Sequence, residues 1–540
     1  MSQNKFTSWF LNWIKDPFKA IFFIVLIGYL FLYTPFGLEN GDMGSIFGIS
    51  WSMYNGYIPH VDFYYIKPAF PPYFHSLFLY LSEDFAYLIN RGFYYVQVFT
   101  FAWLTVDLLK NHFKSINANT QYFLATLAAI ITIHNYPPMP WNTIDGVFFT
   151  VIGIYILLKK ENWYWIALAT LCISLGVLSK QSFYFMPVFI TAYLIWNKAY
   201  IKLGTFIAFG VVFAFSSIGI LFALGAWEPF IEQTFSFTSG GSFIEAGFKN
   251  YLRSAYENWT WLLLTLVLLW AARHKDMSPN SGLTVVFVLI AGALLNFYLK
   301  EDSYHTVKAF MFQLWFLLAI GYVFWTAIKS KEQKYRLLLL LLCLSWCASI
   351  SNGFKTPISY AVPLVISLYV YLQENRSEIV YKWASLAVLA AFLGVFYVGY
   401  QTVYNDSERG ELTYNMGDIF TRLRGIKSDE ATYKQYEQLK ALDAKYDNYT
   451  ILPSMTLGHY VTNTKNPIGV DWVFNHHLAD DIDAHIKMLE DQDVTVFLEP
   501  FENHKNSYEE SSLLTVYIKE NWQQIDHTPY FRVYKKPDNK

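Results

Sequence analysis

Two ionisable residues in one polar stretch, Asp42 and Lys67, have the side chains that a group transfer to a hydroxyl requires. A carboxylate can remove the proton from an acceptor hydroxyl, and an ammonium can stabilise a phosphate leaving group. A sugar transfer that inverts the anomeric centre suits this pair, because phosphate departs without strong acid help. On spacing alone, the alternative that Asp42 caps a short helix stays open.

The stretch that carries this pair, residues 39–73, reads ENGDMGSIFGISWSMYNGYIPHVDFYYIKPAFPPY and lies between hydrophobic segments. A polar loop beside such segments is where a membrane protein keeps ionised groups at low cost. The spacing of its apolar residues predicts a helix over 42–55, lying along the membrane surface. A second surface helix is expected over Phe70–Leu81, after a proline-rich bend.

Five further ionisable residues are candidates for the same site, and three of them have a structural alternative. Asp62 either orients the acceptor or binds loop backbone, and Asp145, at the start of a span, either faces the same cavity or caps its helix. Lys180 either helps to hold phosphate or extends its side chain to the interface. Glu39 and His60 complete the set of residues for acceptor contact or support of the base.

The order of residues in this loop matches a known pattern. Asp42 is followed by Gly56, then by PHVDF at 59–63, and then by Lys67-Pro68. This order resembles the first outer loop of the GT-C superfamily of membrane glycosyltransferases. The resemblance is closest to the branch of protein O-mannosyltransferases and the lipid A aminoarabinose transferase. It covers about the first 200 residues and includes an acid at the head of a later span.

This resemblance implies a role for each of the matching residues. Asp42 would be the catalytic base, Lys67 would contact the donor phosphate, and Lys180-Gln181 would match a Lys-Gly or Lys-Gln junction of the family. The donor would be a sugar on a polyprenyl monophosphate such as undecaprenyl phosphate. Met43 departs from the pattern, because the family has a second acid there, and so does Ala69, which replaces a proline.

The composition supports a membrane protein. The chain has 540 residues, of which 54% are hydrophobic, 20% aromatic and only 15% charged, which is too apolar for a soluble enzyme. A net charge of -2 gives no reason to expect a nucleic-acid partner. The three cysteines lie inside apolar runs and are assigned to packing rather than to a metal site: Cys172, Cys343 and Cys347.

The fold class predicted is an α-helical integral membrane protein with about 13 transmembrane helices, because each span needs about 20 apolar residues. Apolar runs begin near Lys19, Arg91, Gln121, Thr143, Trp163, Ser182, Leu203, Trp259, Leu283, Val307, Leu337, Pro357 and Trp383. Lys and Arg are concentrated in one set of loops, which is therefore cytoplasmic. An odd number of spans then places the N-terminus in the cytoplasm and both the first loop and the C-terminal tail outside, in a cell (inner) membrane.

Three regions are expected. Residues 1–19 form a cytoplasmic amphipathic N-terminus, and residues 20–404 form the transmembrane domain with its active-site loop (37–73) and a second outer loop (226–258). Residues 405–540 form a small extracytoplasmic α/β domain. Its predicted helices cover 429–446, 479–491 and 509–522, and its predicted strands cover Tyr449–Leu452, 494–498 and 530–534.

A cluster of His and Asp residues in the C-terminal region has two interpretations, a metal site or the start of a helix. His476-His477, Asp480, Asp481, Asp483 and His485 contain metal-ligand side chains, but acids in this order equally suit a helix N-terminus. No metal ligand is assigned and no cofactor is required, with a divalent cation left open.

The sequence therefore predicts a polyprenyl-phosphate-sugar-dependent inverting glycosyltransferase. Its partners would be the lipid-linked donor, the bilayer and an extracytoplasmic acceptor, which is a lipid, a glycan or a protein. One alternative is a lipid-linked oligosaccharyltransferase, which usually shows an Asp-x-Asp pair in its outer loops. A polyprenyl-lipid transporter or flippase is the other, and it predicts internal repeats.

Overall fold

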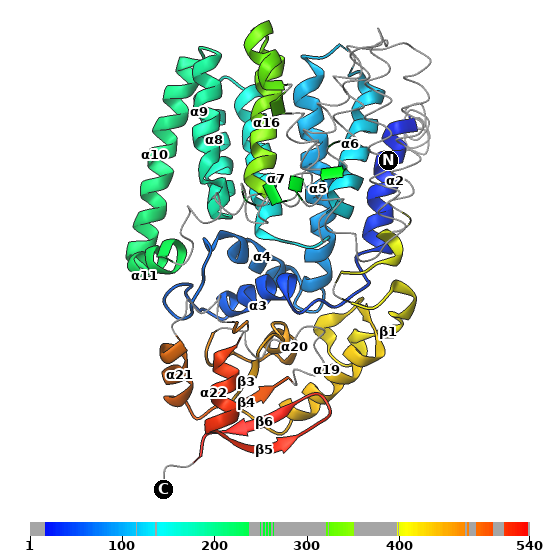
Figure 1. Cartoon of the computed structure of the whole chain (residues 1–540), viewed down its shortest axis with the longest axis vertical. Coiled ribbons are helices and arrows are strands. Elements are labelled where there is room, and N and C mark those ends of the chain that lie inside the picture. Colours follow the sequence, from blue (N-terminus) through cyan, green and yellow to red (C-terminus); the bar gives the residue numbers. More distant parts are fainter. Residues whose placement is uncertain are drawn as a thin grey trace, which may run out of the picture.

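The structure is a computed structural model. It describes residues 17–236, 320–349 and 397–537, apart from 115, 136, 137, 322, 398, 405, 470, 471, 475–481 and 500–511, together with scattered residues between 249 and 263. The protein is mostly helical in these parts, and apolar helices stand side by side in the upper half of Figure 1.

These bundle helices coincide with the predicted apolar runs. They are α2 (Pro17–Leu32), α5 (Ala86–Lys110), α6 (Ala118–Asn135), α7 (Asn142–Lys159), α8 (Trp163–Val177), α9 (Met186–Trp196), α10 (Tyr200–Ala223) and α16 (Gln333–Ser349). Among the described residues, α5, α7 and α10 are long and apolar enough to cross a membrane, and α2, α8 and the Thr120–His134 part of α6 are shorter apolar helices. The run expected from Ser182 begins instead with a 3₁₀ turn, Gln181–Phe185, before α9.

Large apolar side chains point out of the bundle as well as into it. On α10, Ile201 is 87% exposed and Phe215 is 70% exposed. A helix that is apolar around its whole circumference suits a lipid environment. The spans expected near Trp259, Val307 and Trp383 are described only in part. Those expected near Leu283 and Pro357 and the helix expected within 1–16 lie outside the described residues, so the count of about 13 stays a prediction.

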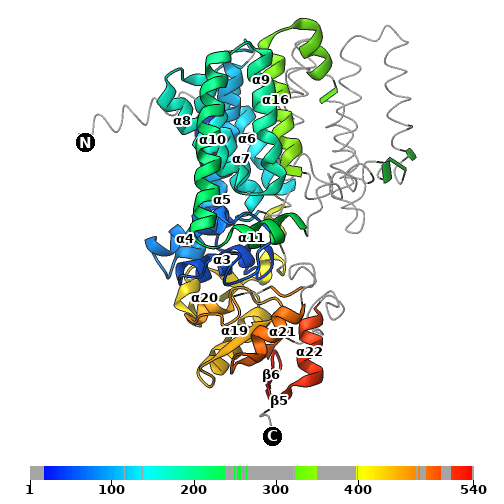
Figure 2. The same ribbon diagram turned by 90° about the vertical axis from the view of Figure 1, so that its left-hand side faces the viewer.

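Two short helices lie across one end of this bundle. They are α3 (Asp42–Tyr54) and α4 (Phe70–Leu81), which end within a residue of the predicted bounds. Pro71 and Pro72 lie in the first turn of α4, where a missing backbone N–H removes no helical hydrogen bond. Figures 1 and 2 show both helices between the bundle and the C-terminal elements.

The C-terminal elements form a four-stranded sheet with helices around it. The strand order is β3-β4-β6-β5, in which β3 (Tyr449–Leu452) is parallel to β4 (Thr495–Leu498). The strand β6 (Arg532–Lys535) is antiparallel to both β4 and β5 (Gln523–His527). The accompanying helices are α19 (Glu430–Asp443), α20 (Gly458–Thr462), α21 (Ile482–Glu490) and α22 (Leu513–Asn521).

Before this sheet, residues 406–428 form short turns and a two-stranded ribbon. The ribbon pairs β1 (Tyr414–Asn415) with β2 (Lys427–Ser428), and 3₁₀ turns cover Arg409–Glu411, Met416–Asp418 and Thr421–Leu423. In the second outer loop, α11 (Trp227–Ile231) continues into a π-helical turn, Glu232–Ser236.

The first loop shares a hydrophobic core with the C-terminal sheet. Phe63 and Tyr65 are buried in one cluster with residues of the sheet and its helices, including Leu452, Val496 and Ile518. Because the core holds the loop that carries Lys67, the C-terminal elements fix part of the candidate site. The predicted domain limits themselves stay predictions.

Candidate active site

Asp42 is the first residue of α3, and a different carboxylate caps that helix. Glu39 is buried and accepts hydrogen bonds from the backbone N–H groups of Gly41, Asp42 and Met43 at 2.7, 3.0 and 2.7 Å. A carboxylate at this position satisfies the orphan amides and favours the positive end of the helix dipole. The capping task considered for Asp42 thus belongs to Glu39, and the side chain of Asp42 is left for other contacts.

Lys67, near the far end of the first loop, lies within electrostatic reach of Asp42. Its Nζ lies 4.3 Å from the centre of the Trp141 ring, and it makes no hydrogen bond or ion pair with the residues that the structure describes. Burial lowers the pKa of Lys67 to about 8, although the negative charge of Asp42 acts in the opposite direction. The ammonium therefore has donors to offer to an anion.

Lys180 comes to the same place from the junction between α8 and the 3₁₀ turn. Its side chain is 8% exposed, and its Nζ donates a hydrogen bond of 2.9 Å to Thr143 Oγ1. Burial and the positive charge of Lys67 lower the pKa of Lys180 to about 7, and Asp42 again opposes the shift. Two lysines and one aspartate from three segments thus lie within electrostatic reach of one another. Their roles as base and phosphate-binding residues stay predictions.

The start of α7 holds these segments together. Asn142 Nδ2 donates to Tyr65 Oη at 3.2 Å and to the carbonyl oxygen of Ser179 at 3.3 Å. Gln181 Nε2 donates to the carbonyl oxygen of Ile66 at 2.7 Å. These bonds connect the residues immediately before Lys67 with those on either side of Lys180, so the two lysine-bearing segments are held beside each other.

Asp145, one turn further along α7, lies in the interior. It is fully buried, and its carboxylate accepts from His75 Nε2 at 2.9 Å and from Gln97 Nε2 at 2.8 Å. His75 Nδ1 lies 2.7 Å from Asn90 Oδ1. The side chain therefore joins α4, α5 and α7 and does not cap its own helix, while a supporting role for Asp145 in the site stays a prediction.

The remaining loop candidates, Asp62 and His60, contact the first loop and the second outer loop respectively. Asp62 is exposed, and its Oδ2 accepts from the backbone N–H of Ile58 at 2.6 Å, which is the structural alternative considered for it. His60 is 3% exposed, has a φ of 70°, and its Nδ1 lies 3.0 Å from Gln233 Oε1. Burial lowers the pKa of His60 to about 4. Gln233 also accepts from the backbone N–H of Tyr65 at 3.0 Å, so the second outer loop supports the first.

Tyr404 is a site residue that the sequence does not predict. Its hydroxyl donates a hydrogen bond of 2.8 Å to Asp42 Oδ2, across 362 positions of the chain. No local pattern marks this tyrosine among the 41 in the chain. Trp141 and Thr143 are likewise contacts that only the structure reveals.

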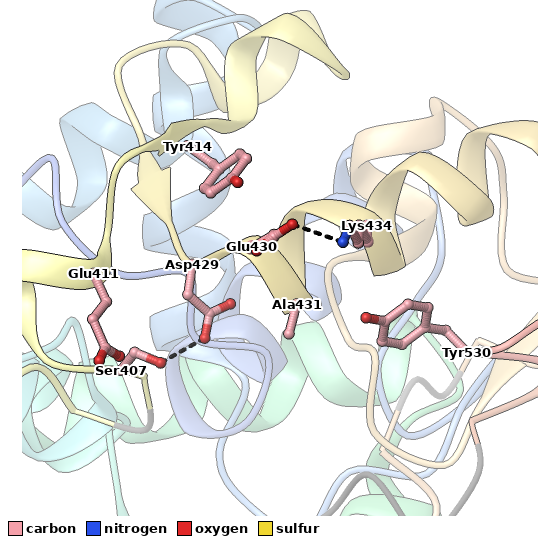
Figure 3. A pocket seen from close by; sticks show the side chains of 8 residues that line it. All are labelled: Ser407, Glu411, Tyr414, Asp429, Glu430, Ala431, Lys434 and Tyr530. Carbon is pink, nitrogen blue, oxygen red and sulfur yellow. Dashed lines mark hydrogen bonds and ion pairs between the residues drawn. The ribbon is translucent and has the colours of Figure 1, made fainter.

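A separate pocket lies at the start of α19. It has a volume of about 420 Å³ and is lined by Ser407, Glu411, Tyr414, Asp429, Glu430, Ala431, Lys434 and Tyr530. Figure 3 shows an ion pair of 2.7 Å between Lys434 and Glu430 and a hydrogen bond of 2.6 Å from Ser407 to Asp429. None of the predicted site residues lines it.

Metal-binding side chains do not gather in the described part of the chain, where no group of three or more His, Cys, Asp or Glu residues could hold an ion. His476, His477, Asp480 and Asp481 lie outside the described residues. Asp483 and His485 are in α21, at its first turn and its middle.

No protein-family model and no curated protein matches this sequence. Among solved structures, the chain is similar to the archaeal oligosaccharyltransferase AglB from Archaeoglobus fulgidus in complex with an inhibitory peptide and a dolichol-phosphate. The identity is 12%, with 97% of this chain and 75% of that chain covered and a TM-score of 0.45. For the oligosaccharyltransferase of the same organism with Zn and sulfate, the identity is 13%, the coverages are 92% and 70%, and the TM-score is 0.43. For its apo form, the identity is 11%, the coverages are 98% and 75%, and the TM-score is 0.47.

Proposed function

We propose that this chain is a membrane glycosyltransferase of GT-C type that moves one sugar from a polyprenyl-phosphate carrier to an acceptor outside the cytoplasm. The observation that carries the proposal is the placement of Lys67 over Trp141 and of Lys180 on Thr143, both at the start of α7, within electrostatic reach of Asp42. The resemblance of the first loop to the GT-C pattern supports the same assignment.

Two lysines whose burial lowers their pKa values, with the charge of Lys67 lowering that of Lys180 further, are costly for a folded protein unless an anion joins them. The donors of Lys67 have no partner among the described residues, and Lys180 is held by Thr143 at hydrogen-bonding distance. A phosphate group supplies the negative charge that offsets both lysines and several oxygens that accept hydrogen bonds from them. A polyprenyl chain would lie in the bilayer beside the bundle, where apolar surface such as that of α10 is exposed.

In the proposed reaction, Asp42 takes the proton from the acceptor hydroxyl as that oxygen attacks the anomeric carbon of the sugar. The bond between the anomeric carbon and the phosphate oxygen breaks, and the phosphate keeps the electron pair. Lys67 and Lys180 stabilise the charge that develops there, which is a large term in a site with little water. One displacement inverts the anomeric centre, and Asp42 is left protonated.

The test is transfer by the purified, folded protein from radiolabelled undecaprenyl-phosphate hexoses and pentoses to an envelope lipid extract. Asp42→Asn should lower the rate by about a hundredfold or more, as expected for loss of a general base. Asp62→Asn, a matched change in the same loop at an exposed residue, should leave the rate within about twofold.

Equal rates for the wild type and Asp42→Asn would refute the role of the base. Turnover only with a pyrophosphate-linked oligosaccharide and a divalent cation would replace the proposal by the oligosaccharyltransferase alternative. Movement of the carrier lipid across the bilayer without transfer would favour a transporter.

A further inference from the structure

The residues that lead into the C-terminal region run along the entrance of the first loop. We call residues 404–409, apart from Asn405, the connecting segment. Asp406 Oδ2 accepts from the backbone N–H of Leu38 at 2.8 Å and from the hydroxyl of Ser428 at 3.0 Å. At the end of the segment, Arg409 donates to the carbonyl oxygen of Leu32. The connecting segment is thus bonded to both ends of the turn that precedes Asp42.

Arg409 strengthens the attachment of the connecting segment to this turn. It is buried, and its guanidinium lies 4.7, 4.7 and 4.4 Å from the ring centres of Tyr33, Phe36 and Tyr400. Cation–π contacts in a desolvated place are worth more than exposed ones. A segment held at Asp406 and Arg409 has little freedom, so its tyrosine is presented to α3 in a fixed position.

This position gives Tyr404 a defined effect on the base. The Tyr404 hydroxyl donates a hydrogen bond to Asp42 Oδ2, whereas Oδ1 receives no hydrogen bond from the described residues. One oxygen is therefore anchored, which restricts rotation of the carboxylate and leaves Oδ1 available to an acceptor hydroxyl. Fixing a catalytic group in a reactive orientation is a large part of enzymatic rate enhancement.

We propose that Tyr404 is a positioning residue for Asp42, so that sugar transfer depends on the docking of the connecting segment against the first loop. This inference rests on the proposed function, because it takes Asp42 as the base. It adds that the C-terminal part of the chain contributes to the chemistry of a site whose other residues lie in the first 180 positions.

The test compares Tyr404→Phe with Tyr400→Phe, which removes one hydroxyl from a tyrosine four residues earlier while keeping its ring over Arg409. Tyr404→Phe should lower kcat about tenfold or more with the KM for the donor unchanged, and Tyr400→Phe should change neither. A purely structural effect would instead reduce the amount of folded enzyme and the binding of donor together.

A measurement without turnover separates this inference from the proposed function. Thermal unfolding of Tyr404→Phe, Asp42→Ala and the double variant should show non-additive midpoints, because either single change already breaks the same bond. Additive midpoints would refute the contact. A wild type that transfers no sugar would refute the proposed function, whereas full kcat in Tyr404→Phe beside an active wild type would refute this inference alone.

Discussion

The paired lysines predict an anion site whose affinity depends strongly on pH. With pKa values of about 8 for Lys67 and about 7 for Lys180, the empty site loses most of its positive charge between pH 6 and pH 9. An anion binds the protonated lysines, so binding takes up protons over this range. From pH 7 to pH 9, titration of Lys180 should weaken binding roughly fiftyfold and titration of Lys67 about tenfold, if both stay protonated in the complex.

The perturbation is Lys180→Met, which keeps an unbranched side chain one atom shorter and removes the charge. This variant should bind about tenfold or more weakly at pH 6.5, because a charge-assisted contact to phosphate is lost. Its affinity should then fall only about tenfold from pH 7 to pH 9, since Lys67 alone still titrates. Loss of the repulsion between the lysines can only reduce this remaining dependence, because it keeps Lys67 charged to higher pH.

The assay is direct binding of a polyprenyl methyl phosphate, which carries one unchanging negative charge over this range and no sugar to transfer. Lys160→Met provides the matched control, since Lys160 is an exposed residue at the opposite end of α7. It should bind with the affinity and pH dependence of the wild type. Wild-type affinity that is constant from pH 7 to pH 9, or a Lys180→Met variant that follows the wild type, would refute the site.

Three further predictions concern stability. Without ligand, the folded state binds fewer protons than the unfolded state above pH 7, because folding lowers the pKa of Lys180. The unfolding temperature of the wild type should therefore rise from pH 7 to pH 9, and that of Lys180→Met should rise less. A flat or falling wild-type curve would contradict this prediction. Glu39→Gln should lower the unfolding free energy by about 1 kcal/mol through loss of the α3 cap. Asp62→Asn is the control and should leave the unfolding free energy unchanged. Asp145→Ala should cost about 3 kcal/mol or more, because it leaves His75 buried without its carboxylate; a stable Asp145→Ala protein in denaturant titrations would show that the network carries little energy.

The elements that local sequence determines were predicted well. The bounds of α4 and β3 are those expected, and α3 differs by one residue, because apolar spacing and the prolines of the loop act over a few positions. The strand β5 was missed. Its residues, QQIDH, are almost all exposed at the edge of the sheet, so they carry no alternation of buried and exposed side chains that a sequence could reveal.

The candidate site was likewise predictable only in part. A loop motif and a lysine at a span junction were enough to propose Asp42, Lys67 and Lys180 as neighbours. The hydrogen bond from Tyr404 could not be proposed, because it joins residues 362 positions apart and any of many tyrosines could make it. The cap by Glu39 was missed for another reason, since it lies two residues before Gly41, outside the position where capping side chains are usual.

The shared core of the first loop and the C-terminal sheet has a consequence for biosynthesis. Trp51 donates to the carbonyl oxygen of Thr464, and Tyr57 donates to that of Asn466, which are separations of 413 and 409 residues. At about 5–20 residues per second, a ribosome needs some 20–80 seconds to make the intervening chain. During that time the residues around Lys67 have none of their partners in the sheet. The proposed active site is therefore among the last parts of the protein to mature, and a nascent chain halted before residue 450 would be inserted but inactive.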